Sequence, residues 1–316
     1  MKSKYSNNFR TWLATLSLGA CLLGSASVVS AGVDAKDTKA PVIDAAPPDQ
    51  WIHALLQLDF SDHYITPRGL DVENEGMIFQ PLFLVFWDVY HNKSGGFLDD
   101  INITTGVWSS FHTHADGPEL KHWNEFDPIG GIAFTFLKDW KFEINYTSFV
   151  SMNGSYPTST HLSFQLDYDD SKMMGKFALH PYVAFWQEIH EKATVTFNPA
   201  TSNESSYFTI GINPTFKLTD WLKVEFPTYI NLNNKDFYQQ FDGTGGGSGL
   251  GVFGTEAKFT IPLSFIPKDL GFWSFYAGVK YYHLNNAGLL DGNEVLTPNQ
   301  HKKDLVQYHA GISIFF

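Results

Sequence analysis

The sequence predicts an all-β protein, a single antiparallel transmembrane β-barrel of about twelve strands with short periplasmic turns and long extracellular loops. Segments long enough to cross a bilayer as tilted strands follow one another from Trp51 onward. Short and long connections alternate between these segments. The last segment, 304–316, sets apolar residues on one face against small or polar residues on the other and ends on an aromatic. A soluble β-sandwich could also end in this way, so the prediction depends on the whole chain.

The N-terminal segment, 1–31, has the features of a cleaved signal peptide. Basic residues precede an apolar stretch that ends at Val29-Ser30-Ala31, small residues of the kind a signal peptidase cuts after. An alternative lies at Leu18-Gly19-Ala20-Cys21, which looks like a lipoprotein cleavage site and would leave Cys21 lipidated. We favour cleavage after Ala31, because the apolar run continues past Cys21. Residues 32–50, rich in Ala, Asp and Pro, predict a flexible periplasmic segment, and 51–316 form the expected barrel.

The expected strands share a length near that of a membrane-crossing strand and mostly show a two-residue period. The segment 77–90 is the exception: it is apolar on both faces, which indicates that it packs against something inside the barrel. In chain order, the expected strands are 51–61, 77–90, 97–110, 125–137, 140–151, 159–168, 176–188, 205–218, 221–231, 249–265, 272–284 and 304–316.

The connections separate a barrel from a sandwich more clearly than any single strand. Those after even-numbered strands are short, as at 138–139 and 219–220, whereas those after odd-numbered strands are mostly long, as at 62–76 and 285–303. Transmembrane barrels have this asymmetry, and a sandwich gives no reason for it. We expect the glycine-rich loop 232–248 to be flexible enough to fold into the bore.

The composition excludes several classes of partner and site. Aromatic residues make up 16 % of the chain and charged residues only 17 %, below the roughly 25 % usual in soluble domains. The net charge of -12 becomes -15 once the three basic residues of the signal peptide are removed. This acidity argues against nucleic acid as a partner. Cys21 is the only cysteine and Arg68 the only arginine after the signal peptide, so the sequence predicts no disulfide and no cationic ladder for anions.

Several of these features resemble the TorF-like porin family. They are the export signal, the segment that follows it, a first strand running into Ser61-Asp62, the run Trp123-Asn124-Glu125-Phe126-Asp127 at a central strand, and the terminal Phe316. The resemblance is to the general barrel pattern over the whole mature chain. It implies a single outer-membrane barrel with a channel role, and it carries over no functional residues.

The polar faces of the strands are expected to line the bore. Because acids outnumber basic residues in the chain, a water-filled bore would favour cations or neutral polar solutes. Alternatively, the charged groups pair with one another and fill the barrel, since twelve strands lie between the roughly eight that side chains fill and the 16 or more that leave a channel. The pore-lining candidates are Asp59, Asp127, Lys141, Glu143, His161, Asp167, Lys223, Glu225, Glu256, Lys258, Lys280 and His309.

One loop carries a weak candidate metal site at His112, His114 and Asp116. Imidazoles two residues apart at a strand end point to one side and suit a divalent transition metal. A solvated loop with a chance grouping explains the same residues more simply. We therefore predict neither a metal nor any other cofactor.

The sequence thus predicts an outer-membrane channel of a Gram-negative bacterium for passive diffusion of small polar or cationic solutes, and not an enzyme. Its expected partners are outer-membrane lipids and lipopolysaccharide, small solutes, and the barrel-assembly machinery, which would act on the C-terminal strand ending in Phe316. Two other classes remain open. One is an outer-membrane hydrolase that uses Ser109 or Ser110 with His112, or Asp62 with His63. The other is a non-conducting structural or adhesive barrel.

Overall fold

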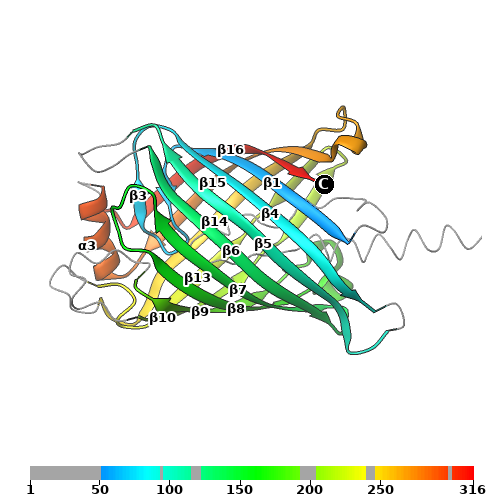
Figure 1. Cartoon of the computed structure of the whole chain (residues 1–316), viewed down its shortest axis with the longest axis horizontal. Helices are drawn as coiled ribbons and strands as arrows, with labels where there is room; N and C mark the ends of the chain where they lie inside the picture. Colours follow the sequence, from blue (N-terminus) through cyan, green and yellow to red (C-terminus); the bar gives the residue numbers. More distant parts are fainter. Residues whose placement is uncertain (1–50, 93–94, 115–121, 193–203, 240–245, 298–300) are drawn as a thin grey trace, which may run out of the picture.

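The computed structural model describes residues 51–92, 95–114, 122–192, 204–239, 246–297 and 301–316, which form one closed antiparallel barrel of twelve strands (Figure 1). The expected signal peptide and the segment after it lie outside the described residues. The barrel strands are β1 (Ile52–Ser61), β4 (Ile78–His91), β5 (Leu98–His112), β6 (Trp123–Phe136), β7 (Trp140–Ser151), β8 (Ser159–Tyr168), β9 (Tyr182–His190), β10 (Ser206–Ile212) with β11 (Thr215–Thr219), β12 (Leu222–Glu225) with β13 (Thr228–Asn233), β14 (Gly249–Pro262), β15 (Phe272–Leu284) and β16 (Asp304–Phe315).

The barrel closes where the last strand meets the first. β16 pairs with β1 from Leu55 opposite Phe315 to Ser61 opposite His309. On its other side β16 pairs with β15, and β15 pairs with β14, so the ring is continuous. Closure satisfies the backbone hydrogen bonds of both terminal strands, which would otherwise present free edges.

Two predicted features of the strands need correction. The segment 176–188 begins its strand only at Tyr182, because α2 (Ser171–Met174) and η1 (Gly175–Phe177) lengthen the preceding turn. The segments 205–218 and 221–231 are each split in two, near Pro214 and Pro227. A proline has no N–H to donate to the sheet, so regular pairing stops at these two places.

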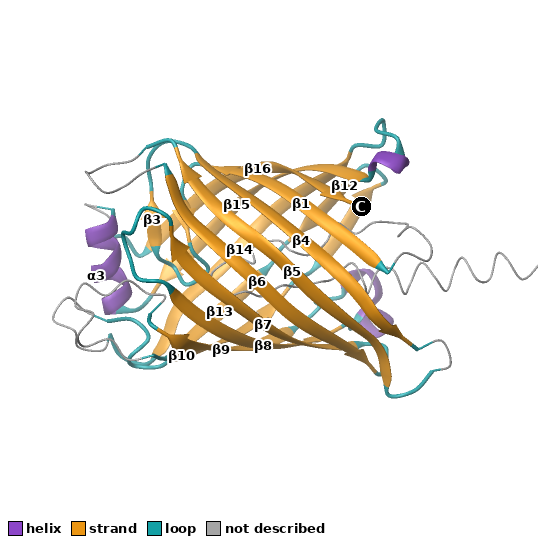
Figure 2. Ribbon diagram, viewed as in Figure 1, coloured by secondary structure: helices purple, strands orange, loops and turns teal. Residues whose placement is uncertain are grey.

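The two ends of the barrel differ. The C-terminus and the short turns lie at one end, and the long loops with α3 (Ala287–Leu296) lie at the other (Figures 1 and 2). One of the turns, between β14 and β15, contains η3 (Lys268–Leu270). No helix among the described residues is long and apolar enough to cross a membrane.

The outer face of the wall is apolar and exposed. Phe208, Ile210 and Phe275 are 44 %, 46 % and 40 % exposed, although each lies within a fully paired strand. Their neighbours in sequence Thr209 and Ser274 are buried on the opposite, inward face. The alternation therefore places the apolar side chains outside and the polar side chains inside, the reverse of a soluble sandwich.

The first long loop returns into the bore and fills part of it. It carries β2 (Tyr64–Ile65) and β3 (Asp71–Glu73), which pair as a small hairpin. Tyr64 packs in a cluster with inward side chains of β4, among them Leu82, Leu84 and Phe86. This packing explains why 77–90 is apolar on both faces, as the sequence indicated.

Candidate functional site: the bore and the loop that crosses it

The loop between β1 and β4, residues 62–77 and called here the inner loop, crosses the bore and contacts the opposite wall. The carbonyl of Pro67 accepts hydrogen bonds from the Tyr229 hydroxyl at 3.0 Å and from Nδ2 of Asn231 at 2.9 Å, both on β13. The carbonyl of Arg68 accepts one from the Tyr238 hydroxyl at 2.5 Å. The carbonyl groups of this turn thus accept hydrogen bonds from side chains on distant strands and loops. These bonds hold the inner loop inside the barrel.

Helix α3 holds the same turn from the loop end of the barrel. Nδ2 of Asn293 donates to the carbonyl of Gly69 at 3.0 Å, and the backbone N–H of Asp71 donates to Oδ1 of Asn293 at 3.0 Å. Gly69 has φ of 84°, and a Cβ there would lie 2.6 Å from Leu284, so a glycine is needed at this turn. Asn293 is fully buried and uses both ends of its amide on the inner loop.

The sequence indicated that 232–248 is flexible enough to fold into the bore. The structure shows that the inner loop crosses it, which the sequence did not indicate. The described part of 232–248 contributes Phe237 and Tyr238, both buried, to the apolar cluster that packs around the inner loop. Residues 240–245 lie outside the described ranges.

Arg68, at the tip of the inner loop, is 2 % exposed. Its Cζ lies 4.8 Å from the ring centroid of Phe149 and 5.5 Å from that of Trp186. Its charge also interacts with Asp127 on β6, which is fully buried. In the sequence, Arg68 stands out only as the lone arginine after the signal peptide. Its place in a long loop otherwise poor in cations is the one sequence signal that points to it.

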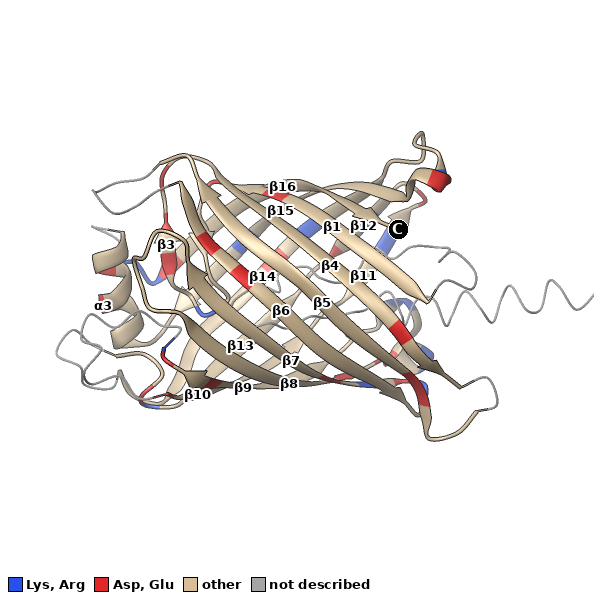
Figure 3. Ribbon diagram, viewed as in Figure 1, with Lys and Arg blue, Asp and Glu red and all other residues tan. Residues whose placement is uncertain are grey.

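The pore-lining candidates all lie on the inward face of their strands, as the alternation of burial along each strand indicates. Figure 3 shows segments of both charges on the barrel strands, blue for Lys and Arg and red for Asp and Glu. Most of the pore-lining candidates are buried. Lys141, Asp167 and Lys223, near the turn end, are partly exposed. Whether these residues line a conducting path stays a prediction.

The structure brings several of these candidates together. His309 lies between two carboxylates, with Nδ1 3.0 Å from Oδ1 of Asp59 and Nε2 2.6 Å from Oε1 of Glu256. Lys223 pairs with Glu225 at 3.1 Å, and Lys141 pairs with Glu143. These groups therefore form ion pairs inside the barrel. The sequence had left such pairing open as an alternative to a charged pore lining.

Three more candidates make aromatic or polar contacts inside the barrel. His161 stacks on Trp186 with ring centroids 4.4 Å apart and an interplanar angle of 22°. Oδ1 of Asp167 accepts a hydrogen bond from Nε2 of Gln165 at 2.8 Å. Lys258 lies with Nζ 4.7 Å from the ring centroid of Tyr276. The remaining candidates, Asp127 and Lys280, interact electrostatically with Arg68 and with His309, respectively.

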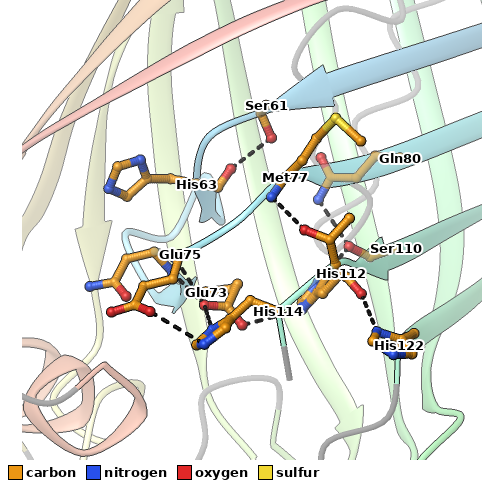
Figure 4. Close-up of polar contacts among 12 residues, drawn as sticks. Ser61, His63, Glu73, Glu75, Met77, Gln80, Ser110, His112, His114 and His122 are labelled. Atoms are coloured by element: carbon orange, nitrogen blue, oxygen red, sulfur yellow. Dashed lines mark hydrogen bonds and ion pairs between the residues drawn. The ribbon is translucent and has the colours of Figure 1, made fainter. Parts of the chain in front are cut away.

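A second polar cluster joins the inner loop to the end of β5 (Figure 4). Oγ of Ser110 lies 2.9 Å from Nε2 of His112, and Nε2 of Gln80 donates to the same hydroxyl at 3.2 Å. Nδ1 of His112 is 3.9 Å from Glu73 Oε2, and Nδ1 of His114 is 3.8 Å from Glu73 Oε1. Glu73 of the inner loop thus lies between the two imidazoles.

Whether His112, His114 and Asp116 come together as metal ligands stays a prediction. Asp116 lies outside the described residues. Among the residues that are described, the group whose ligand atoms all lie within 4.8 Å of one another is Asp169, Asp170 and His180, in the turn between β8 and β9. Asp170 already accepts hydrogen bonds from the backbone N–H groups of Leu179 and His180, so its carboxylate closes the turn.

The comparisons with known proteins add little to this geometry. No family model matches the chain, and no curated protein matches it. It is similar to a solved outer-membrane channel from Pseudomonas putida F1 at 9 % identity and a TM-score of 0.49, covering 86 % of this chain and 97 % of that one. It is also similar to the NanC porin, at 9 % identity and a TM-score of 0.43, covering 83 % of this chain and 98 % of that one. A third similar structure is outer membrane phospholipase A from Escherichia coli, at 12 % identity and a TM-score of 0.43, covering 82 % and 92 %. Likeness at this level carries no argument about activity.

Proposed function

We propose that this chain is an outer-membrane channel for small polar or cationic solutes, held closed on its extracellular side by the inner loop. The observation that carries the proposal is a closed ring of strands with an apolar outer face and charged residues on its inner face. A ring that pairs all its strands can cross hydrocarbon without leaving backbone polar groups unpaired. Fixed charges that face the bore then select which ions can pass through it.

Exposed aromatic residues support a membrane location. Trp51 and Trp221, at the turn end, are 63 % and 60 % exposed, and Tyr308, toward the loop end, is 60 % exposed. Trp and Tyr gather at the two membrane–water boundaries of membrane proteins. The short turns would face the periplasm and the long loops the outside, as in other membrane barrels.

The burial of the inward side chains indicates which end of the bore is closed. Along β6, Glu125, Asp127 and Ile129 are buried at the loop end, whereas Ala133 and Thr135 are partly exposed at the turn end. β7 and β8 follow the same trend. On the β6–β8 side, solutes would therefore meet accessible side chains in the periplasmic half and buried ones in the extracellular half. On the opposite side Phe86, Ser274 and Phe315 are buried near the turn end. Conduction requires the inner loop, which crosses the bore, to move.

Conductance of the purified, refolded protein in planar bilayers tests the proposal. The informative variant replaces residues 64–73 with a Gly-Ser linker of equal length, which removes the hairpin but keeps the barrel strands. We expect discrete openings that are rare in the unmodified protein and frequent in the variant, with a reversal potential that favours potassium over chloride. Lys172→Ala, an exposed substitution in a turn, should behave as the unmodified protein. If neither protein shows discrete conductance at any voltage, the channel proposal is wrong.

A hydrolase is the second candidate, supported by the 2.9 Å contact between Ser110 and His112. A hydroxyl beside an imidazole that faces a carboxylate is the arrangement used by serine hydrolases. Here Ser110 is fully buried, so a substrate would reach it only after the loops move. Hydrolysis of a chromogenic ester that is lost in Ser110→Ala would favour this candidate.

A further inference from the structure

The guanidinium of Arg68 lies against aromatic rings that belong to the barrel wall. Phe149 of β7, His161 of β8 and Trp186 of β9, called here the aromatic cage, lie on three neighbouring strands. The ring centroids of Phe149 and His161 are 4.2 Å apart, and those of His161 and Trp186 are 4.4 Å apart. All three side chains are almost completely buried.

The three rings of the cage are carried by barrel strands. Trp186 is backed by Tyr207 of β10, with ring centroids 5.0 Å apart, and by Phe237, at 5.6 Å. The pairing of β7 with β8 and of β8 with β9 fixes the strands that carry it. Inside the ring of the cage, only the guanidinium of Arg68 comes from the inner loop, although Ile65 and Leu70 of that loop pack in the same apolar cluster. The pairing of β7, β8 and β9 should keep the three rings together if the loop moved.

The charges around the cage suit a cation. Asp127 and Glu125, on β6, are 0 % and 6 % exposed, and the charge of Arg68 interacts with Asp127. The Tyr64 hydroxyl donates to Oε2 of Glu125 at 2.7 Å, which positions that carboxylate inside the bore. A buried cation is costly unless opposite charge and polarisable faces surround it, and both are present here.

We propose that the aromatic cage with its two acids is the binding site of the bore for guanidinium-bearing cations, and that Arg68 occupies it as an internal substitute for the solute. This inference rests on the proposed channel function and names its solute class. A planar guanidinium stacks on ring faces and presents donors at its edge, whereas an ammonium is a compact, strongly hydrated charge. The site therefore favours guanidinium compounds over amines of the same charge.

Binding measured by calorimetry, without conductance, tests the site itself. The probe is methylguanidinium, which matches the end of an arginine side chain, and the protein is the refolded Arg68→Ala variant in detergent. We expect binding to this variant and none to the unmodified protein, in which Arg68 fills the cage. Urea, planar but neutral, and methylammonium, charged but not planar, should not produce the same heat.

A second substitution checks that the rings bind the probe. In the Arg68→Ala background, Phe149→Leu should weaken methylguanidinium binding by about threefold to thirtyfold, the range expected from losing one cation–ring contact. Lys172→Ala in the same background removes a distant, exposed cation and should leave binding unchanged. If Arg68→Ala fails to refold, Arg68→Gln removes the guanidinium and shortens the side chain, which frees the end of the cage for the probe.

Bilayer recordings separate failure of this inference from failure of the channel proposal. Arg68→Ala should conduct more than the unmodified protein, and millimolar methylguanidinium should reduce its current at least severalfold by refilling the cage. Conductance without binding or block would overturn the guanidinium site and leave the channel standing. Binding without conductance would support the site and overturn the channel, and equal block by urea or methylammonium would also overturn the site.

Discussion

Gly278 leaves room for the ring of His309 on the neighbouring strand. The two residues are directly opposite in the pairing of β15 with β16, and a Cβ at position 278 would lie 2.4 Å from Nε2 of His309. The imidazole can therefore lie across β15 and reach Glu256 on β14, while its other nitrogen reaches Asp59 on β1. One histidine thus joins the strands on both sides of the barrel closure.

Gly278→Ala should destabilise the barrel by about 1–3 kcal/mol, because the added methyl group must displace His309 or Glu256 from a packed, hydrogen-bonded position. The measurement is urea unfolding of the refolded protein in detergent, followed by tryptophan fluorescence. Gly130→Ala on β6 is the matched control, since nothing lies within 4 Å of a Cβ there. Equal midpoints for the two variants would contradict the role assigned to Gly278.

Asn293→Ala should release the inner loop without unfolding the barrel. The substitution removes the donor to Gly69 and the acceptor of the Asp71 N–H, and unsatisfied buried groups of this kind cost about 1–3 kcal/mol each. Arg68 is the only arginine after the expected signal peptide, so an arginine-specific protease reports directly on its exposure. We expect cleavage at Arg68 to be on the order of tenfold faster in the variant, given that 1.4 kcal/mol corresponds to a factor of ten.

The control for this experiment is Glu294→Gln, at the next residue of α3, which is exposed and pairs with His301. It should be cleaved at the rate of the unmodified protein. An Asn293→Ala protein that resists the protease equally well would show that α3 does not hold the loop.

Asp71 should make the seating of the inner loop depend on pH. Burial raises the pKa of Asp71 to about 7, Glu73 adds to the rise, and His63 offsets part of it. The pKa of Asp71 is higher when the inner loop lies in the bore (the seated state) than when the loop is released. Asp71 therefore favours seating most below about pH 4, where it is protonated in both states. This contribution declines as pH increases from about 4 to about 7 and is lost above that range.

Cleavage at Arg68 by the same protease measures this dependence between pH 5 and pH 8, after correction for protease activity on a model peptide. We expect the unmodified protein to become more susceptible as pH increases toward 7. Asp71→Asn cannot lose a proton, so its susceptibility should change less. A variant with the same pH profile as the unmodified protein would assign the dependence to another group.

Asp169 should stabilise the turn between β8 and β9 at neutral pH. Hydrogen bonds from His180 and Ser171 hold the pKa of Asp169 well below its usual value of 3.8, despite partial burial. A lowered pKa gives stability that is present above pH 3.8 and is lost as pH falls through the folded-state value. Asp169→Asn should therefore cost about 0.5–1 kcal/mol at pH 7, discounted for its partial exposure, and progressively less below pH 4.

Urea unfolding at pH 7 and at pH 3 measures the difference. Asp220→Asn is the control in another turn, because the side chain of Asp220 is 100 % exposed. A cost for Asp169→Asn that does not shrink in acid would mean that its carboxylate stabilises the turn by some means other than charge.

The sequence alone determined the wall of the barrel. Consecutive residues of a strand point to opposite faces, so the sequence alone predicts that Phe208 and Thr209 face opposite sides of the wall, as they do. The alternating connection lengths identified the two ends, and the final strand was expected to meet the first, as it does. The same period placed Asp59, Glu256 and His309 on the inward face, although it could not tell that they meet around one imidazole.

Only the tertiary structure decided what fills the barrel. The inner loop has no period, and its position depends on contacts between residues far apart in the chain, such as Pro67 with Tyr229, 162 positions later. Composition indicated only that the glycine-rich 232–248 is flexible enough to enter the bore, because composition says nothing about which hydrogen-bond donors a loop would meet there. A strand is specified by its own neighbours in sequence, whereas the cage around Arg68 exists only once β7, β8 and β9 lie side by side.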